Sequence, residues 1–406
     1  MHPMDRVASA IALADRLLAG DALEPRPPVR FRRTVAIGDP QASARRVFGV
    51  LAHHDLLADD GRLRDDVQLI SIGDHFDYGT RAQGTTAEAQ LDGRRVLRWL
   101  SAHDATQVVI LAGNHDVARV MELAGATDAR FAAGAIRAGE LLELKHRDRA
   151  AYLAGLDDYA ATYPELPTPG VVHRDFSAYT EDQRALVAGL LLGGRLRLAA
   201  TARLGGGELL LTHAGVTTRE LGLLGIPDER RAGAIAAALE HHLAAAVDGV
   251  RPAWTAGRWT PLSLAPLHVP GAVGHDALDG LPEGGGLLYH RPADPDRPGA
   301  DRSWENERAR PRRYHPKALP AGLRQVAGHT GHPKCVAELV RWRDPDLIEE
   351  PAGLRTLWVH GPAIRYELGV RPPTDGAAVL YMIDPSMYRA PSAALEVLEL
   401  EPGSAT

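Results

Sequence analysis

Short apolar runs and helix-like segments alternate along the first part of the chain. Apolar side chains recur at helical spacing in the first segment, and helices are expected at residues 5–19, 43–57 and 86–102. Short strands are expected between and after them, at residues 31–37, 67–72 and 107–111. This order predicts parallel strands joined by crossover helices, and therefore an α/β fold.

The rest of the chain is less regular and predicts an insertion and a long loop region. Residues from about 117 to 195 are mostly of helical type, and we interpret them as a cap. Residues 196–204 and 208–212 flank three glycines and predict a β-hairpin, which an Ala-rich helix at 228–247 follows. Residues 251–322 show little periodicity, which in a compact protein is typical of a functional loop region. Further strands are expected at residues 325–327, 355–359, 378–383 and 395–400.

These segments divide the chain into two unequal parts. Residues 1–30 form an N-terminal helix and a Pro-rich linker, and residues 31–406 form one large domain. The cap insertion at about 117–195 and the irregular loop region at about 251–322 belong to that domain.

Five of the expected strands each end in a short motif with a residue that can bind metal. The motifs are Gly38-Asp39-Pro40-Gln41, Gly73-Asp74-His75-Phe76-Asp77-Tyr78-Gly79, Gly113-Asn114-His115-Asp116, His213-Ala214-Gly215 and Gly328-His329-Thr330. In open α/β sheets, ligands bind beyond the carboxyl ends of the strands, which is where each motif lies. Carboxylate and amide oxygens favour Mn, Mg or Fe, and imidazole extends the range to Zn and Ni.

The order of these motifs resembles that of the calcineurin-like metallophosphoesterases, and the late pair resembles their phosphoprotein-phosphatase branch. Within that branch, the motifs are similar to those of bacterial Shewanella-like phosphatases and symmetrical diadenosine tetraphosphatases. The resemblance extends from about residue 34 to 332, with most of the cap and loop regions unmatched. It implies a layered α/β fold, with central β-sheets flanked by helices, and an enzyme that hydrolyses phosphoric esters.

Site residues follow from the resemblance position by position. Asp39 and Gln41 would hold a first metal ion, and Asp74 would bridge two ions. The second ion would be held by Asn114, His213 and His329. Manganese is the expected metal, with Fe, Zn, Ni and Mg as alternatives.

The resemblance also implies how the reaction would proceed. His115 resembles the proton donor to the leaving oxygen, and Asp77 resembles the carboxylate that orients it. Asn114 would also contact the substrate. The metal pair would lower the pKa of a bound water and polarise the phosphoryl group.

Two positions depart from the family pattern. Gln41 replaces the usual histidine, and its neutral amide oxygen predicts a weaker or more Mn-selective first site. Tyr78 replaces an arginine that contacts phosphate in the protein phosphatases. Arg291 is the expected substitute, since a guanidinium binds phosphate through two parallel hydrogen bonds.

Composition limits the expected partners. The formal net charge of −6 argues against a nucleic-acid surface, and no run approaches the roughly 20 apolar residues that span a membrane. Cys335 is the only cysteine, which excludes an intramolecular disulfide. We therefore expect a cytoplasmic protein, and the resemblance implies a phosphorylated small molecule or a phosphoprotein as its substrate. The sequence does not indicate an oligomeric state.

Three functions remain open from the sequence. The first is a phosphomonoesterase of the protein-phosphatase type. The second is a nucleotide phosphodiesterase or dinucleoside polyphosphate hydrolase, which differs in leaving group and pocket size. The third is a metal-binding module without turnover, which only Gln41 and Tyr78 favour.

Overall fold

The computed structural model describes residues 3–27, 29–78, 86–279, 283–297, 311–345, 352–371 and 375–406. Gly79, the last residue of the second motif, and parts of the expected loop region lie outside the described residues.

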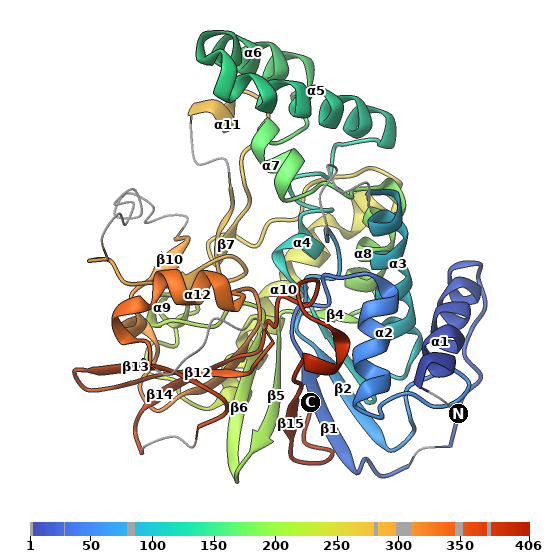
Figure 1. Ribbon diagram of the computed structural model, residues 1–406, viewed down its shortest axis with the longest axis vertical. Helices are drawn as coiled ribbons and strands as arrows, with labels where there is room; N and C mark the ends of the chain where they lie inside the picture. Colours follow the sequence, from blue (N-terminus) through green and yellow to red (C-terminus); the bar gives the residue numbers. More distant parts are fainter. Residues whose placement is uncertain are drawn as a thin grey trace.

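Two sheets form the centre of the molecule (Figure 1). The first has the order β15-β1-β2-β3-β4, and β1 to β4 run parallel while β15 is antiparallel to β1. Its strands are β1 (Arg33–Ile37), β2 (Val67–Ser71), β3 (Val108–Leu111), β4 (Leu196–Arg197) and β15 (Leu398–Leu400).

The second sheet is mixed and has the order β13-β12-β14-β11-β6-β5. Its inner strands β14, β11 and β6 are parallel, and the outer pairs are antiparallel. Its strands are β5 (Ala199–Leu204), β6 (Gly207–Thr212), β11 (Arg324–Ala327), β12 (Arg355–His360), β13 (Ala363–Leu368) and β14 (Ala378–Met382). Two short pairs lie outside both sheets: β7 (His268–Val269) with β8 (Gly285–Gly286), and β9 (Arg291–Pro292) with β10 (Arg313–Tyr314).

Alternation along the strands explains how the layers pack. Successive side chains of a strand point to opposite faces, so each buried strand needs apolar cover on both sides. Val35 and Ile37 of β1 pack in the cluster under the helices, whereas Ala36 packs in a second cluster. That second cluster also contains Leu211 and Val379 of the other sheet. The two sheets therefore pack face to face, with helices on the outside.

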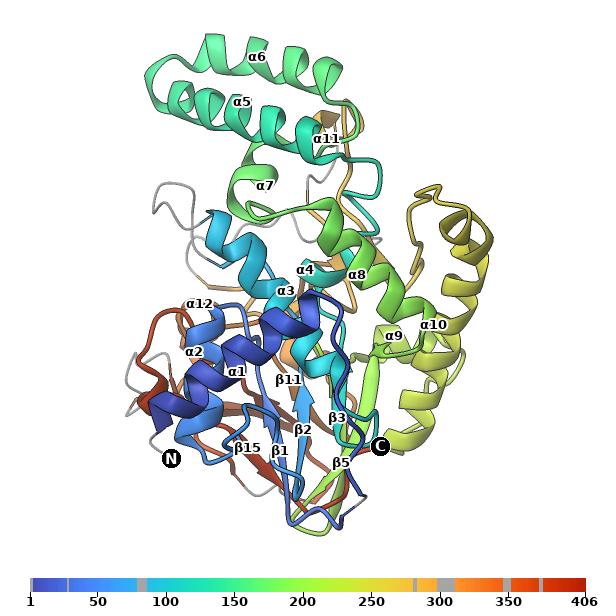
Figure 2. The same ribbon diagram turned by 90° about the vertical axis from the view of Figure 1, so that its right-hand side faces the viewer.

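The helices fall into an outer layer, a cap and a few short connecting segments. The outer layer contains α1 (Pro3–Leu18), α2 (Ala44–His53), α3 (Thr86–Ala102), α8 (Glu181–Leu192) and α10 (Ala232–Thr255). The cap contains α5 (Asp128–Arg147), α6 (Arg149–Thr162), α7 (Pro169–Arg174) and α11 (Asp276–Asp279). The short segments are α4 (Asn114–Val117), α9 (Thr218–Leu223), α12 (His332–Glu338), and the 3₁₀ turns Pro316–Ala318, Val340–Trp342 and Ser392–Ala394. Figure 2 shows α5 and α6 projecting as a hairpin above the sheets.

The expected α/β fold with layered central sheets and flanking helices is confirmed. Within the stretch from 117 to 195, the projecting helices are α5 to α7, whereas α8 packs into the main core through residues such as Val187. Among the described residues, no helix has both the length and the apolar character that crossing a bilayer requires.

Three local expectations differ from the structure. The first arm of the expected hairpin is two strands, because the chain changes sheets at Leu198: β4 joins the first sheet and β5 the second. The Glu240 carboxylate accepts from the backbone N–H groups of Leu198 and Ala199, which holds this crossing. Strand β13 was not expected, and α10 extends into the supposed loop region as far as Thr255.

Candidate metal centre

The strands of both sheets place their following residues at one edge of the molecule. Asp39 follows β1, Asp74 follows β2, and Asn114 follows β3. His213 follows β6 and His329 follows β11 in the other sheet. The approach is close, since a Cβ on Gly328 would lie 2.0 Å from Oδ1 of Asp39. The two sheets thus contribute side chains to a shared site.

The backbone of this edge is strained at residues of the site. Asp74, Asp77 and His329 have φ angles of 56°, 65° and 62°, in a region that non-glycine residues rarely occupy. Each such residue costs on the order of 1–3 kcal/mol and persists only when its surroundings hold it. Here the Asp116 carboxylate holds the second motif, by accepting from the N–H groups of Asp74, His75 and Gly113.

Asp74, His213 and His329 form a buried cluster whose ligand atoms lie within 4.8 Å of one another. Nδ1 of His213 is 2.7 Å from the Ile72 carbonyl, which only accepts, so this nitrogen carries the proton. Nε2 therefore faces Oδ1 of Asn114 at 3.2 Å and Oδ2 of Asp74 at 3.4 Å, and it offers a lone pair to an ion once its own proton is lost. A cation between these atoms would bind all three side chains.

His329 is also held by a backbone carbonyl, but through Nε2 and not through Nδ1. Its Nε2 is 2.7 Å from the Tyr289 carbonyl, so Nδ1 keeps a lone pair for an ion. Burial lowers the pKa of His329, so the ring is neutral, as a metal ligand must be. Its backbone N–H donates to both Asp39 oxygens, at 3.0 and 2.9 Å.

Charge in the cluster is unbalanced without a cation. Burial raises the pKa of Asp39, and the nearby Asp384 carboxylate raises it further. Burial opposes the charged form of His213, but the adjacent Asp74 carboxylate outweighs this and raises the pKa of His213 to about 10. A proton on His213 thus meets the electrostatic demand that a divalent ion would meet. The donor set of carboxylates, an amide and imidazoles fits such an ion.

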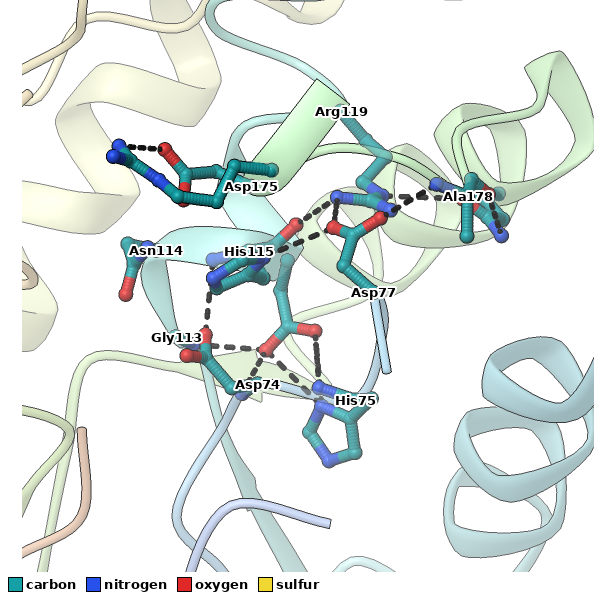
Figure 3. A network of polar contacts seen from close by, with 12 residues as sticks. Asp74, His75, Asp77, Gly113, Asn114, His115, Arg119, Asp175 and Ala178 are labelled. Atoms are coloured by element: carbon teal, nitrogen blue, oxygen red, sulfur yellow. Dashed lines mark hydrogen bonds and ion pairs between the residues drawn. The ribbon is translucent and has the colours of Figure 1, made fainter. Parts of the chain in front are cut away.

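A second group of contacts surrounds His115 (Figure 3). Nδ1 of His115 donates to Oδ2 of Asp77 at 3.0 Å, and the backbone N–H of His115 donates to Asp74 at 2.9 Å. Asp77 also accepts from Nη1 of Arg119 at 2.5 Å and from the Ala178 N–H at 3.0 Å. Although burial alone would lower it, the carboxylates of Asp74 and Asp77 raise the pKa of His115. Asp77 therefore orients the ring and favours its protonated form.

The structure brings the sequence-predicted residues to one cavity of about 120 Å³. Its walls include Asp39, Gln41, Asp74, Asn114, His115, Arg291 and His329. His213 is fully buried against Asn114, and Asp77 lies behind His115. Asp77 also lines an adjoining cavity of about 580 Å³, which shares His115 and Arg291 with the first.

Three basic side chains, Arg291, Lys334 and Arg389, line this cavity without an acidic partner among the described residues. Among the same residues, Nε of Arg291 has no hydrogen-bond partner although it is buried. Partial removal from water lowers the pKa of Arg291 and of Lys334, and the positive charge of Arg291 lowers the pKa of Lys334 further. An anion in the cavity would relieve both costs. Tyr78 does not fill this role, because its hydroxyl donates to Asp92 at 2.7 Å.

Sequence reasoning did not identify Arg119, Lys334 or Asp384 as site residues. Arg119 is four positions after His115, a spacing that places two side chains on one helical face. Asp384 follows the apolar run of β14 as Asp39 follows that of β1, so the strand-end rule applied to it as well. For Lys334 the sequence holds no comparable signal.

Comparison with protein families and with curated proteins identifies no family for this chain. No protein-family model matches this chain, and no curated protein matches it. The interpretation of the cavity therefore depends on its own side chains.

Proposed function

We propose that this protein is a metal-dependent phosphomonoesterase with a dinuclear metal centre, as the resemblance to calcineurin-like metallophosphoesterases implies. The observation that carries the proposal is that Arg291, Lys334 and Arg389, which form no ion pair among the described residues, line the same cavity as Asp74 and His329 of the metal cluster. Metal ligands and anion-binding groups on one small cavity are what phosphoryl transfer requires. A cytoplasmic location remains part of the proposal.

The metal ligands of the proposal are those of the motifs. Asp39 and Gln41 would hold one ion, Asn114, His213 and His329 the other, and Asp74 both. When bound, such a pair supplies a hydroxide-like nucleophile at neutral pH and offsets negative charge on the phosphoryl oxygens.

His115 is the proposed general acid. Because its Nδ1 donates to Asp77, the proton that it can transfer is on Nε2. Transfer of that proton to the departing oxygen avoids the release of an alkoxide. Arg119 keeps Asp77 ionised, since the guanidinium lies 2.5 Å from the carboxylate.

The charge of the cavity favours a monoester over a diester. A phosphate monoester carries up to two negative charges and a diester one, and Arg291, Lys334 and Arg389 offer the cavity three positive charges that form no ion pair among the described residues. The adjoining cavity of about 580 Å³ would receive the leaving group.

Hydrolysis of p-nitrophenyl phosphate by the Mn-loaded full chain is the direct test. We expect turnover that EDTA abolishes and Mn restores, with kcat/KM for the monoester at least about tenfold above that for bis-p-nitrophenyl phosphate. The monoester preference follows from the charge argument above. Diadenosine tetraphosphate is the third substrate. A preference for the diester or the dinucleotide contradicts the proposal, and no turnover of any of the three favours a module without activity.

Replacing Arg291 by alanine is expected to lower kcat/KM for the monoester by about 10- to 100-fold. The guanidinium would otherwise form charge-assisted hydrogen bonds with phosphate, worth roughly 1.5–3 kcal/mol. Lysine at this position should restore only part of the loss, because an ammonium lacks the planar fork. Steady-state kinetics of both variants measure the effect.

Arg313 provides a matched control for Arg291. It pairs directly with Arg291 in the β9–β10 ladder, but its Nε lies 3.4 Å from Oε1 of Glu338 and it does not line the cavity. Arg313→Ala should therefore leave kcat/KM nearly unchanged. Equal losses in the two variants would assign the effect to the strand pair and not to phosphate binding.

A further inference from the structure

We propose that Asp384, which follows β14, is an additional ligand of the first metal ion, beside Asp39 and Gln41. The inference depends on the dinuclear centre proposed above. Asp384 would add a carboxylate to the ion that Gln41 binds, where the resembled family has a histidine in place of Gln41.

Strand register places Asp384 beside a residue of the cluster. Strands β11 and β14 are parallel, and Ala327 lies opposite Met382. His329 and Asp384 each come two residues after this pair, so both leave the same edge of the sheet. The backbone bond from Ile383 N–H to the Ala327 carbonyl, 2.8 Å, continues the pairing up to the site.

Contact between the two sheets brings Asp39 to the same place. A Cβ on Gly38 would lie 2.1 Å from the carbonyl oxygen of Ile383, so the ends of β1 and β14 touch. The next residue of each strand end is an aspartate, Asp39 or Asp384. Both carboxylates line the cavity of about 120 Å³ together with Gln41.

The Asp384 carboxylate is buried but only half satisfied. The side chain belongs to a residue that is 7% exposed, and its Oδ1 accepts from the Ser386 N–H at 2.7 Å. Among the described residues, no hydrogen bond or ion pair reaches Oδ2 of Asp384. Because Asp384 lines the cavity, a metal ion there could bind this oxygen without displacing a protein hydrogen bond.

Arg355 holds the backbone at Asp384. Nη2 of the fully buried Arg355 donates to the Asp384 carbonyl oxygen. This bond holds the backbone of Asp384, and the Ser386 N–H holds its Oδ1, before any ion binds. With the bridging Asp74, three carboxylates and one neutral amide would form an all-oxygen set, which favours Mn or Mg over Zn at the first site.

Metal binding by the full-length protein tests this inference without reference to activity. Isothermal titration with MnCl₂ should give two sites for the unchanged protein. Asp384→Asn and Asp384→Ala should retain one tight site and bind the second ion at least about tenfold more weakly. Even mutation of a residue that only hydrogen-bonds to a metal ligand lowers metal affinity by about 10- to 100-fold. The exchange-coupled Mn signal in electron paramagnetic resonance should disappear in both variants.

Asp294 is the matched control. It is 3% exposed, and its Oδ1 accepts from the N–H two residues later, that of Asp296, at 3.0 Å. It therefore forms the same kind of turn as Asp384, but away from the cavity. Asp294→Asn should bind two Mn ions as the unchanged protein does.

The outcomes separate this inference from the proposed function. Two tight sites in both Asp384 variants would overturn the ligand role and leave the phosphomonoesterase proposal standing. If Asp384→Ala fails to fold, the isosteric asparagine variant decides. No Mn binding by the unchanged protein would remove the dinuclear centre and the ligand role together.

Discussion

Asp74→Asn is expected to abolish the stabilisation of this protein by Mn. Oδ1 of Asp74 accepts the His115 N–H at 2.9 Å, so an asparagine would keep its oxygen there. Its amide N–H group would then face Nε2 of His213, where the unchanged protein has Oδ2 at 3.4 Å. An amide nitrogen does not bind a divalent cation, and the bridging ligand is lost.

Unfolding with and without Mn measures this effect. A ligand at 100 times its dissociation constant stabilises the folded state by about 2.7 kcal/mol. The unchanged protein should show a shift of this order, and Asp74→Asn should show none and have no measurable phosphatase activity. Asp92→Asn is the control, because Asp92 is a buried carboxylate that binds Tyr78 and Arg95 outside the inner cavity. An undiminished Mn shift in Asp74→Asn would exclude the proposed centre.

Replacing His115 by glutamine is expected to lower kcat by about 10²–10⁴-fold, the range that general acid catalysis contributes. Glutamine can still donate to Asp77, so the structure around Arg119 should persist. The loss should be larger for an alkyl phosphate than for p-nitrophenyl phosphate, since a poor leaving group depends more on protonation. Steady-state kinetics with both esters measure the difference.

Two further results would establish that the His115 effect is chemical. Mn binding should stay at two ions, because His115 contacts the cluster only through its backbone N–H. His242→Gln should have full activity, since His242 lies on α10 and its Nε2 donates to the Leu264 carbonyl at 3.0 Å. Equal losses for the two esters in His115→Gln would indicate a positioning role and not proton transfer.

The sequence was informative wherever a rule of strand geometry applied. Parallel strands end at one edge of a sheet, so Asp39, Asp74 and Asn114 could be placed together from their positions alone. The structure extends that edge to the second sheet, through His213 and His329. That these residues bind metal remains a prediction, because neither the fold nor the comparisons test it.

Features that depend on tertiary packing could not be predicted. The apolar run from 196 to 204 looks like one strand, and only the strand pairing of the folded chain shows that it divides between the two sheets. The direction of a single side chain is equally hidden: Lys334 follows Pro333 at the start of α12, and nothing local aims it at the cavity. Asp384 follows a parallel strand as Asp39 does, but it lies outside the five motifs that the sequence shows.

Assembly of the cavity from both sheets has a consequence for how its integrity can be lost. Asp39 and His329, 290 positions apart, join across the sheet boundary through hydrogen bonds of 2.9–3.0 Å. A half-molecule with β1 to β3 alone would keep carboxylates and an amide but neither His213 nor His329. If one sheet slid over the other, the oxygen ligands of the first sheet would separate from the histidine ligands of the second before either sheet unfolded. Metal occupancy would thus measure whether the two layers are docked, which a measurement of helix content does not detect.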